Sequence, residues 1–315
     1  MIKNMSIGIA CALALLAISN GPAMAQGIQI ESGSVEGGAL ETRNEPIRIG
    51  DEVSIKGPIG SRNGSITIGS QVIAESITNR NGSISVGQGG QFGDISTRNG
   101  SVHLGDANRT GKVESRNGQI RLGDENISGT LTSRNGSIVV GRGSQVDGNV
   151  DTRNGSVTLN DQVAVSGGIS TRNGAIQLSP GSEVADMVST RNGRIKLDNA
   201  VVAGDLRTRA GDLVLDNASR VGGDLVMDLG DLPESGGRFL WFSRSVNHPD
   251  AGRIHILGGS EVTGDVIVKL PETFEGKPPV VEIAADSTVH GNIEIDERVE
   301  LVADGRVGGR IQRNP

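Results

Sequence analysis

The stretch Ile95-Ser96-Thr97-Arg98-Asn99-Gly100 contains a short phrase that returns along most of the chain. Ser/Thr-Arg-Asn-Gly recurs every 18 or 19 residues, with imperfect copies at the ends, Arg43-Asn44-Glu45 and Arg209-Ala210-Gly211. A fixed period of this size is typical of a solenoid, in which each repeat is one coil that cannot bury its apolar face alone. We therefore expect functional residues to lie in columns along a rod. The intact Arg-Asn-Gly copies begin at Arg62, Arg80, Arg98, Arg116, Arg134, Arg153, Arg172 and Arg191.

The aliphatic residues of each coil keep a fixed spacing from this phrase. With Arg as position 1, Ile, Val or Leu stands at positions 5 and 7, as in Ile120 and Leu122. Two further apolar points follow, usually four residues apart, as in Val146 and Val150. An apolar residue at every second position indicates a strand with one buried face. The pattern predicts an all-β fold, a single-stranded parallel β-helix (solenoid) of 18–19 residues per coil, right-handed by the general crossover preference.

Strand alternation also assigns directions within the phrase. If Ile95 points inward, then Ser96 and Arg98 point outward, while Thr97 and Asn99 point inward at a corner. Asn at one corner of every coil predicts a ladder of side-chain amides, and the following Gly is expected to supply a positive φ. This expected asparagine ladder consists of Asn63, Asn81, Asn99, Asn117, Asn135, Asn154, Asn173 and Asn192.

Four segments follow from these patterns. The first has Lys3, an apolar run and Ala23-Met24-Ala25, which is typical of a secretory signal with its cleavage site. After Met227 the repeat gives way to a stretch containing Phe239, Trp241 and Phe242, and coils then resume without Arg-Asn-Gly. We predict a signal peptide at 1–25, the repeat solenoid at 26–227, an insertion loop with an aromatic cluster at 228–253, and C-terminal solenoid coils at 254–315.

Composition narrows the class of protein. The chain has no tyrosine, one tryptophan and four phenylalanines, which favours a narrow interior filled by aliphatic stacks. The formal net charge is −7, which weighs against nucleic acid as the main partner. The single cysteine, Cys11, lies in the signal, so we expect no disulfide in the exported protein. We also expect no transmembrane anchor, because no stretch after the signal resembles a membrane span.

The outward arginines are the feature of the sequence that most strongly indicates a function. Stacked at ~4.8 Å, neighbouring unit charges would repel by roughly 0.9 kcal/mol in water. Such a stripe could bind a repeating polyanion, an acidic envelope polysaccharide or lipopolysaccharide phosphates, through charge-assisted bonds. The alternative is a structural role, with guanidinium stacking and bonds to carbonyls or to Asp94, Asp186 and Asp205. This arginine column consists of Arg62, Arg80, Arg98, Arg116, Arg134, Arg153, Arg172, Arg191 and Arg209.

No catalytic, metal or cofactor motif stands out. The histidines, of which His103 lies on an outward strand position, share no metal-ligand spacing, so we expect no metal and no cofactor. Acid pairs such as Asp51-Glu52 are common at corners, where solvation alone explains them. The hexapeptide coil of acyltransferases, also about 18 residues per turn, requires an aliphatic residue every six positions, a spacing this chain lacks.

Two families show similar repeats. The Val-x-Gly-x-Ile units and Asn-Gly repeats resemble bacterial adhesin-type β-strand-repeat proteins, and the units at 262–266, 289–293 and 307–311 also resemble bactofilins. The first resemblance implies an exported solenoid, and the second a β-helix that polymerises end to end. The chain departs from bactofilins, which are cytoplasmic, in its signal, its aromatic insertion and its arginine column.

These observations predict a non-enzymatic, exported β-solenoid, structural or adhesin-like, at the bacterial cell envelope. It would be located in the periplasm, on the cell surface or in the medium. It would bind a polyanionic polysaccharide through the arginine column. The alternative is a self-assembling, bactofilin-like scaffold, a homo-oligomer formed by end-to-end stacking through exposed strand edges. A third reading, a polysaccharide-degrading enzyme, would require a cleft of clustered acids on one face.

Overall fold

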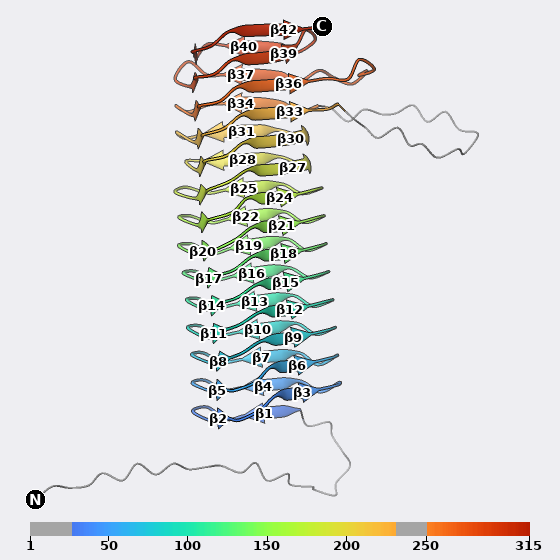
Figure 1. The fold of residues 1–315 in the computed structure, drawn as a ribbon, viewed down its shortest axis with the longest axis vertical. Helices are drawn as coiled ribbons and strands as arrows, with labels where there is room; N and C mark the ends of the chain where they lie inside the picture. Colours follow the sequence, from blue (N-terminus) through green and yellow to red (C-terminus); the bar gives the residue numbers. More distant parts are fainter. Residues whose placement is uncertain (1–26, 231–250) are drawn as a thin grey trace, which may run out of the picture.

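Short strands with alternating buried and exposed residues build every coil of the protein. The structure, a computed structural model, describes residues 27–230 and 251–315. The expected signal at 1–25 and the aromatic cluster Phe239 to Phe242 lie outside these residues. The described chain forms three parallel sheets of 14 strands each and contains no helix (Figure 1). The prediction of an all-β parallel solenoid with 18 or 19 residues per coil is therefore confirmed.

Each coil contributes one strand to each sheet, in the order A, B, C. Sheet A contains β1 (Ile28–Ile30), β4 (Ile47–Ile49), β7 (Ile66–Ile68), β10 (Ile84–Val86), β13 (Val102–Leu104), β16 (Ile120–Leu122), β19 (Ile138–Val140), β22 (Val157–Leu159), β25 (Ile176–Leu178), β28 (Ile195–Asp198), β31 (Leu213–Asp216), β34 (Arg253–Ile256), β37 (Val280–Ile283) and β40 (Glu300–Ala303).

Sheet B is made of the shortest strands, each of them two residues long. It contains β2 (Val35–Glu36), β5 (Ser54–Ile55), β8 (Ile73–Ala74), β11 (Gln91–Phe92), β14 (Arg109–Thr110), β17 (Ile127–Ser128), β20 (Gln145–Val146), β23 (Ala164–Val165), β26 (Glu183–Val184), β29 (Val201–Val202), β32 (Arg220–Val221), β35 (Glu261–Val262), β38 (Thr288–Val289) and β41 (Arg306–Val307).

Sheet C carries the strands that lead into the Arg-Asn-Gly corner. It contains β3 (Leu40–Thr42), β6 (Ile59–Ser61), β9 (Ile77–Asn79), β12 (Ile95–Thr97), β15 (Val113–Ser115), β18 (Leu131–Ser133), β21 (Val150–Thr152), β24 (Ile169–Thr171), β27 (Val188–Asn192), β30 (Leu206–Ala210), β33 (Leu225–Asp228), β36 (Val266–Lys269), β39 (Ile293–Asp296) and β42 (Ile311–Asn314).

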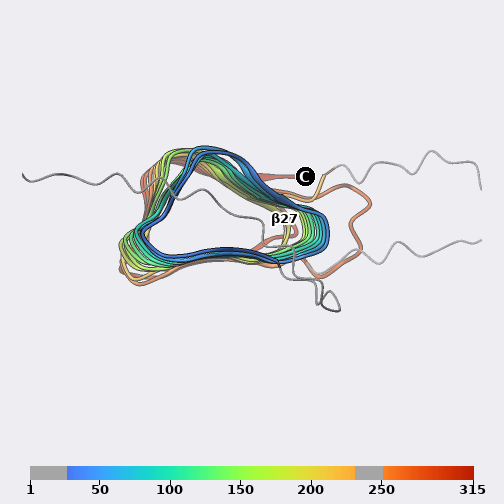
Figure 2. The same ribbon diagram turned by 90° about the horizontal axis from the view of Figure 1, so that it is seen from below.

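Parallel pairing stacks equivalent side chains directly above one another. Ile84 pairs with Ile66 on one side and with Val102 on the other, and all three are buried. Seen along the rod, the coils superpose around a narrow interior (Figure 2). Burying one such aliphatic side chain contributes about 1.5 to 3 kcal/mol, so the columns supply the main stabilisation that a core without many aromatics requires.

The stacking continues across two long excursions of the chain. Leu213 of β31 pairs with Ile254 of β34, and Leu225 of β33 pairs with Val266 of β36. Corner residues that bond across the first excursion are 41 positions apart, and those across the second are 27 apart, against 18 or 19 elsewhere. The second excursion occupies 270–279, and after each excursion the next strand returns to register. The C-terminal coils therefore extend the same rod.

Candidate functional site

The arginine column stands at the corner where sheet C turns into sheet A. Arg62 to Arg172 each directly follow a sheet C strand, Arg191 and Arg209 lie within the last residues of β27 and β30, and the backbones of consecutive corners are hydrogen-bonded. The Asn99 N–H donates to the Arg80 carbonyl at 3.0 Å, and the Asn117 N–H donates to the Arg98 carbonyl at 3.0 Å. Seven of the nine arginines, Arg62 to Arg172, are exposed, while Arg191 and Arg209 are half-buried. The backbone thus places the guanidinium groups in one file along the rod.

The Ser or Thr before each arginine closes the corner from inside. Ser115 is buried, and its Oγ accepts the Gly118 N–H at 2.9 Å while donating to the Gly100 carbonyl of the previous coil at 3.0 Å. In one coil Asn79 replaces the hydroxyl: its Nδ2 donates to the Gly64 carbonyl at 2.7 Å. The phrase therefore begins with a side chain that links each turn to its neighbour and holds the following arginine in place.

The glycine of the phrase is needed for a reason other than the one expected. None of the Arg-Asn-Gly glycines has a positive φ, so that expectation is wrong. Instead the corners stack so closely that a Cβ on Gly118 would overlap the carbonyl oxygen of Gly100. Residues with positive φ gather at the corner between sheets A and B, for example Gln71 (58°), Gly89 (69°) and Glu125 (58°).

The asparagines form a continuous ladder on the surface. Asn99 Nδ2 donates to Asn81 Oδ1 at 2.7 Å, and Asn117 Nδ2 donates to Asn99 Oδ1 at 2.7 Å. Their side chains are exposed, which corrects the expectation that they point inward: the turn begins at the arginine, so strand alternation no longer applies at the next residue. Linked in this way are Asn44, Asn63, Asn81, Asn99, Asn117, Asn135, Asn154, Asn173 and Asn192.

The arginine side chains have no acidic partner in the described part of the chain. None of the nine makes a salt bridge or a side-chain hydrogen bond there. The carboxylates suggested as partners are used elsewhere. Asp94 accepts the Lys112 N–H, Asp186 accepts the N–H of the next residue, and Asp205 pairs with Arg207 at 2.6 Å.

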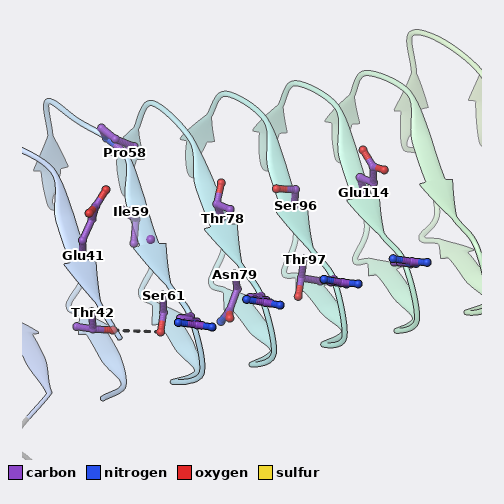
Figure 3. Close-up of a pocket in the computed structure, with 15 residues that line it drawn as sticks. Glu41, Thr42, Pro58, Ile59, Ser61, Thr78, Asn79, Ser96, Thr97 and Glu114 are labelled. Atoms are coloured by element: carbon purple, nitrogen blue, oxygen red, sulfur yellow. Dashed lines mark hydrogen bonds between the residues drawn. The ribbon is translucent and has the colours of Figure 1, made fainter. Parts of the chain in front are cut away.

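Two of the acids beside the column on sheet C, Glu114 and Asp151, are also occupied. Glu114 pairs with Lys112 at 2.7 Å, and Asp151 accepts the hydroxyl of Ser170. In Figure 3, Thr78, Ser96 and Glu114 stand in a row on successive strands, beside the inner row of Asn79 and Thr97. The column therefore carries a run of positive charge that the acids beside it leave unneutralised.

Shallow grooves run along both sides of the column. On the sheet C side, one of about 830 Å³ passes Thr78, Ser96 and Glu114, and another of about 770 Å³ continues along the later coils to Arg191. On the other side, a groove of about 770 Å³ is lined only by arginines and by asparagines of the ladder, from Arg62 to Asn154. These grooves offer guanidinium groups, side-chain amides and hydroxyls at the coil spacing of ~4.8 Å, and the two on the sheet C side also contain the carboxylates of Glu41, Glu114 and Asp151.

The column ends at a partly buried arginine. Arg209 is half-buried, and its Nη2 is buried without a hydrogen-bond partner in the described residues. The column therefore loses its open, solvated character at this end.

The three histidines within the described residues are not brought together. His103 is exposed on β13 of sheet A, His290 is exposed directly after β38, and His255 Nδ1 lies 2.7 Å from Glu282 Oε2. Within residues 27–230 and 251–315, no three His, Cys, Asp or Glu side chains are arranged to hold a metal ion. The same residues contain no helix long and apolar enough to cross a membrane.

No family model matches the chain, and no similar protein was found among curated proteins or solved structures. The fold is that of a β-repeat protein in general. These comparisons support neither the resemblance to adhesin-type repeat proteins nor the resemblance to bactofilins.

Proposed function

We propose that this protein is an exported, non-catalytic β-solenoid of the bacterial cell envelope that holds a polyanionic polysaccharide along its arginine column. The observation that carries the proposal is the file of nine arginines without a salt bridge or side-chain hydrogen bond in the described chain. Stacked cations at ~4.8 Å repel one another by roughly 0.9 kcal/mol per neighbouring pair in water. A bound polyanion would convert this repulsion into attraction.

The grooves support a linear ligand that lies parallel to the rod. A polymer with regularly spaced carboxylates or phosphates would meet a guanidinium at every coil, and each guanidinium can donate two parallel hydrogen bonds to one anionic group. The asparagine amides and the Thr and Ser hydroxyls beside the column supply neutral donors and acceptors for sugar hydroxyls. The overall negative charge of −7 would confine a polyanion to this stripe.

The test compares two variants with equal loss of charge. The column variant carries Arg98→Gln, Arg116→Gln and Arg134→Gln, and the control carries Arg109→Gln, Arg121→Gln and Arg142→Gln, exposed arginines from the same part of the rod outside the column. At roughly 0.5 to 1 kcal/mol per exposed charge contact, the loss of three contacts should make the column variant bind polygalacturonate or purified lipopolysaccharide roughly ten- to hundredfold more weakly.

The control variant should bind these polyanions nearly as well as the wild type, and neutral dextran should bind neither protein. Equal losses in the two triple variants would mean that only total charge matters, and the column proposal would then fail. Export is tested separately by fractionating cells that produce the full chain. Retention of the protein in the cytoplasm would contradict that part of the proposal.

The second candidate is an end-to-end scaffold, which the last coil favours. In the described chain, β40, β41 and β42 each pair with one strand only, and Ile311 and Val302 are 51% and 40% exposed (Figure 1). Unpaired strand edges beside exposed aliphatic side chains can template stacking of another copy. Light scattering across protein concentration checks this candidate, because particles that lengthen with concentration in the wild type and stay single in Ile311→Lys would support it.

A further inference from the structure

A small, basic pocket lies beyond the end of the asparagine ladder, apart from the grooves. Its volume is about 360 Å³, and it is formed by corner and sheet A residues of consecutive coils together with the loop 270–279. Figure 1 shows this loop, after β36, projecting beyond the stacked corners. The residues that give the pocket its chemistry are Arg194, Asp212, Arg253, His255 and Lys277.

Positive charge dominates the pocket. The side chains of Arg194, Arg253 and Lys277 make no salt bridge or hydrogen bond within the described residues. The one lining carboxylate, Asp212, accepts the backbone N–H of Arg253 at 3.1 Å. Three cations against one carboxylate leave an excess of two positive charges around a space large enough for a compact group.

The charged residues are not required by the corner itself. In earlier coils the residue after the phrase is usually serine, as at Ser65, Ser83 and Ser137. The equivalent positions become Arg194, Asp212 and then Arg253 only at the pocket, and there the Ile195 N–H still donates to the Asp212 carbonyl at 2.8 Å. Since serine satisfies the same backbone geometry, the corner does not require charged side chains here. They add ionic groups at this pocket that the other coils lack at this position.

The loop that carries Lys277 is fixed at both ends. Phe274 is buried in the core, and Arg298 donates to the carbonyls of Pro271 at 3.1 Å and Phe274 at 3.4 Å. On the far side, the Glu300 N–H donates to the Pro279 carbonyl at 3.2 Å. Lys277 is therefore held over the corner by anchors on both sides, which limits the entropy lost when it binds a ligand.

The histidine of the pocket is also oriented. Its side chain is 21% exposed, and Glu282 on the adjacent strand β37 holds Nδ1 at 2.7 Å. The second ring nitrogen of His255 makes no hydrogen bond in the described chain, so it is free to meet a ligand.

We propose that this pocket binds a compact oxyanion with two negative charges, a phosphate monoester. The two arginines can each donate a pair of hydrogen bonds to phosphate oxygens, Lys277 adds a point charge from the loop, and the charge of the ligand matches the excess on the lining. The site does not depend on the arginine column, and it is suited to a single group instead of a polymer.

Calorimetric titration of the full chain at constant ionic strength tests the proposal, with inorganic phosphate and glucose 6-phosphate as probes. Saturable binding of one equivalent is expected, weakened at least tenfold by Arg253→Gln and by Lys277→Gln and unchanged by Arg109→Gln. Lys277→Gln lies outside the coils and should fold normally, so it keeps the test valid if Arg253→Gln is unstable. Equal binding of both probes would mean that the oxyanion alone is recognised, and tighter binding of glucose 6-phosphate would assign a sugar ester.

The absence of saturable binding by both probes, or equal weakening by Arg109→Gln, would overturn the proposal. The column variant with Arg98, Arg116 and Arg134 changed to Gln should bind phosphate like the wild type. Polygalacturonate binding that is lost in the column variant but kept in Lys277→Gln would show that the two sites act separately, so either proposal can fail without the other.

Discussion

The Arg-Asn-Gly corner, between sheets C and A, and the corner between sheets B and C both stack from coil to coil, but they use different polar groups to do so. At the Arg-Asn-Gly corner, neutral side chains link the coils: Ser115 bonds to Gly100, and Asn117 bonds to Asn99. Towards the C-terminus an aspartate ladder, defined by Asp205, Asp224, Asp265 and Asn292, performs this task at the corner between sheets B and C, where each carboxylate accepts the N–H of the next member.

This difference shows that one fold can be held both by a ladder of neutral side chains and by a ladder of negatively charged ones. Amides bond without a titratable group, so their ladder should be insensitive to pH. Ionised carboxylates bond more strongly to N–H groups, and this additional strength is lost when they are protonated. The two regions should therefore respond differently to mutation and to acid.

The largest effect should come from the close-packed glycine corner. Gly118→Ala places a Cβ against the Gly100 backbone, which cannot move without disturbing the stacked coils. We expect a loss of about 3 kcal/mol or more in the free energy of unfolding, measured by chemical denaturation. Gly60→Ala is the control, because its Cβ would have an ordinary contact of 3.6 Å with Glu41, and a similar loss there would contradict the explanation.

A slightly smaller effect is expected from the ion pair of the C-terminal coils. The carboxylate of Asp296 is 6% exposed and lies 2.7 Å from Arg298 Nη2. Arg298→Met removes the guanidinium from this carboxylate, leaves it only the backbone N–H of residue 298, and releases the loop 270–279, so we expect the free energy of unfolding to fall by about 3 kcal/mol. Arg306→Met, an exposed arginine in the last coil, should change stability by less than about 0.5 kcal/mol.

Acid should weaken the aspartate ladder before the asparagine ladder. The N–H of Asp224, followed by the side chain of Arg207, lowers the pKa of Asp205 below its ordinary value of 3.8, and Arg298 lowers the pKa of Asp296 in the same direction. A lowered folded-state pKa gives stability that is complete above the ordinary carboxyl pKa and is lost as the pH falls through the folded pKa.

Hydrogen exchange checks this pH dependence. The protection factor of the Asp224 amide should fall about tenfold below pH 3.8, while that of the Asn117 amide stays nearly constant. Asp205→Asn should remove the pH dependence at Asp224. An equal loss of protection at both amides would show that acid loosens the whole rod together.

The smallest effect on stability should follow from breaking the asparagine ladder. Asn117→Ala removes one exposed link between Asn99 and Asn135, at a cost of roughly 0.5 to 1 kcal/mol. Asp265→Ala, the matched break in the aspartate ladder, should cost more because it leaves the Asn292 N–H without its 2.6 Å carboxylate acceptor. Thermal unfolding of the two variants ranks them, and the reverse order would contradict the comparison.

Local pattern was enough to predict much of the molecule. Ile120 and Leu122 were expected on one strand face and both are buried, and Arg98 and Arg116 were expected to point outward and are exposed. The directions of Asn99 and the role of Gly100 were not predicted correctly, because the chain leaves the strand at this corner and stacked backbones, not φ, decide which residue fits. The basic residue Arg194 in place of serine was visible in the sequence, but nothing in the pattern related it to Lys277.

By itself, the sequence determined the parallel solenoid, its coil length and the outward column of arginines, because a strict repeat with period-2 alternation has few other ways to bury its aliphatic residues. Only the tertiary structure decided that Arg194, Arg253 and Lys277 share one pocket and that Arg298 anchors the loop above it. Those contacts join coils across two long excursions, and where such segments return depends on the packing and hydrogen bonds of the closed rod.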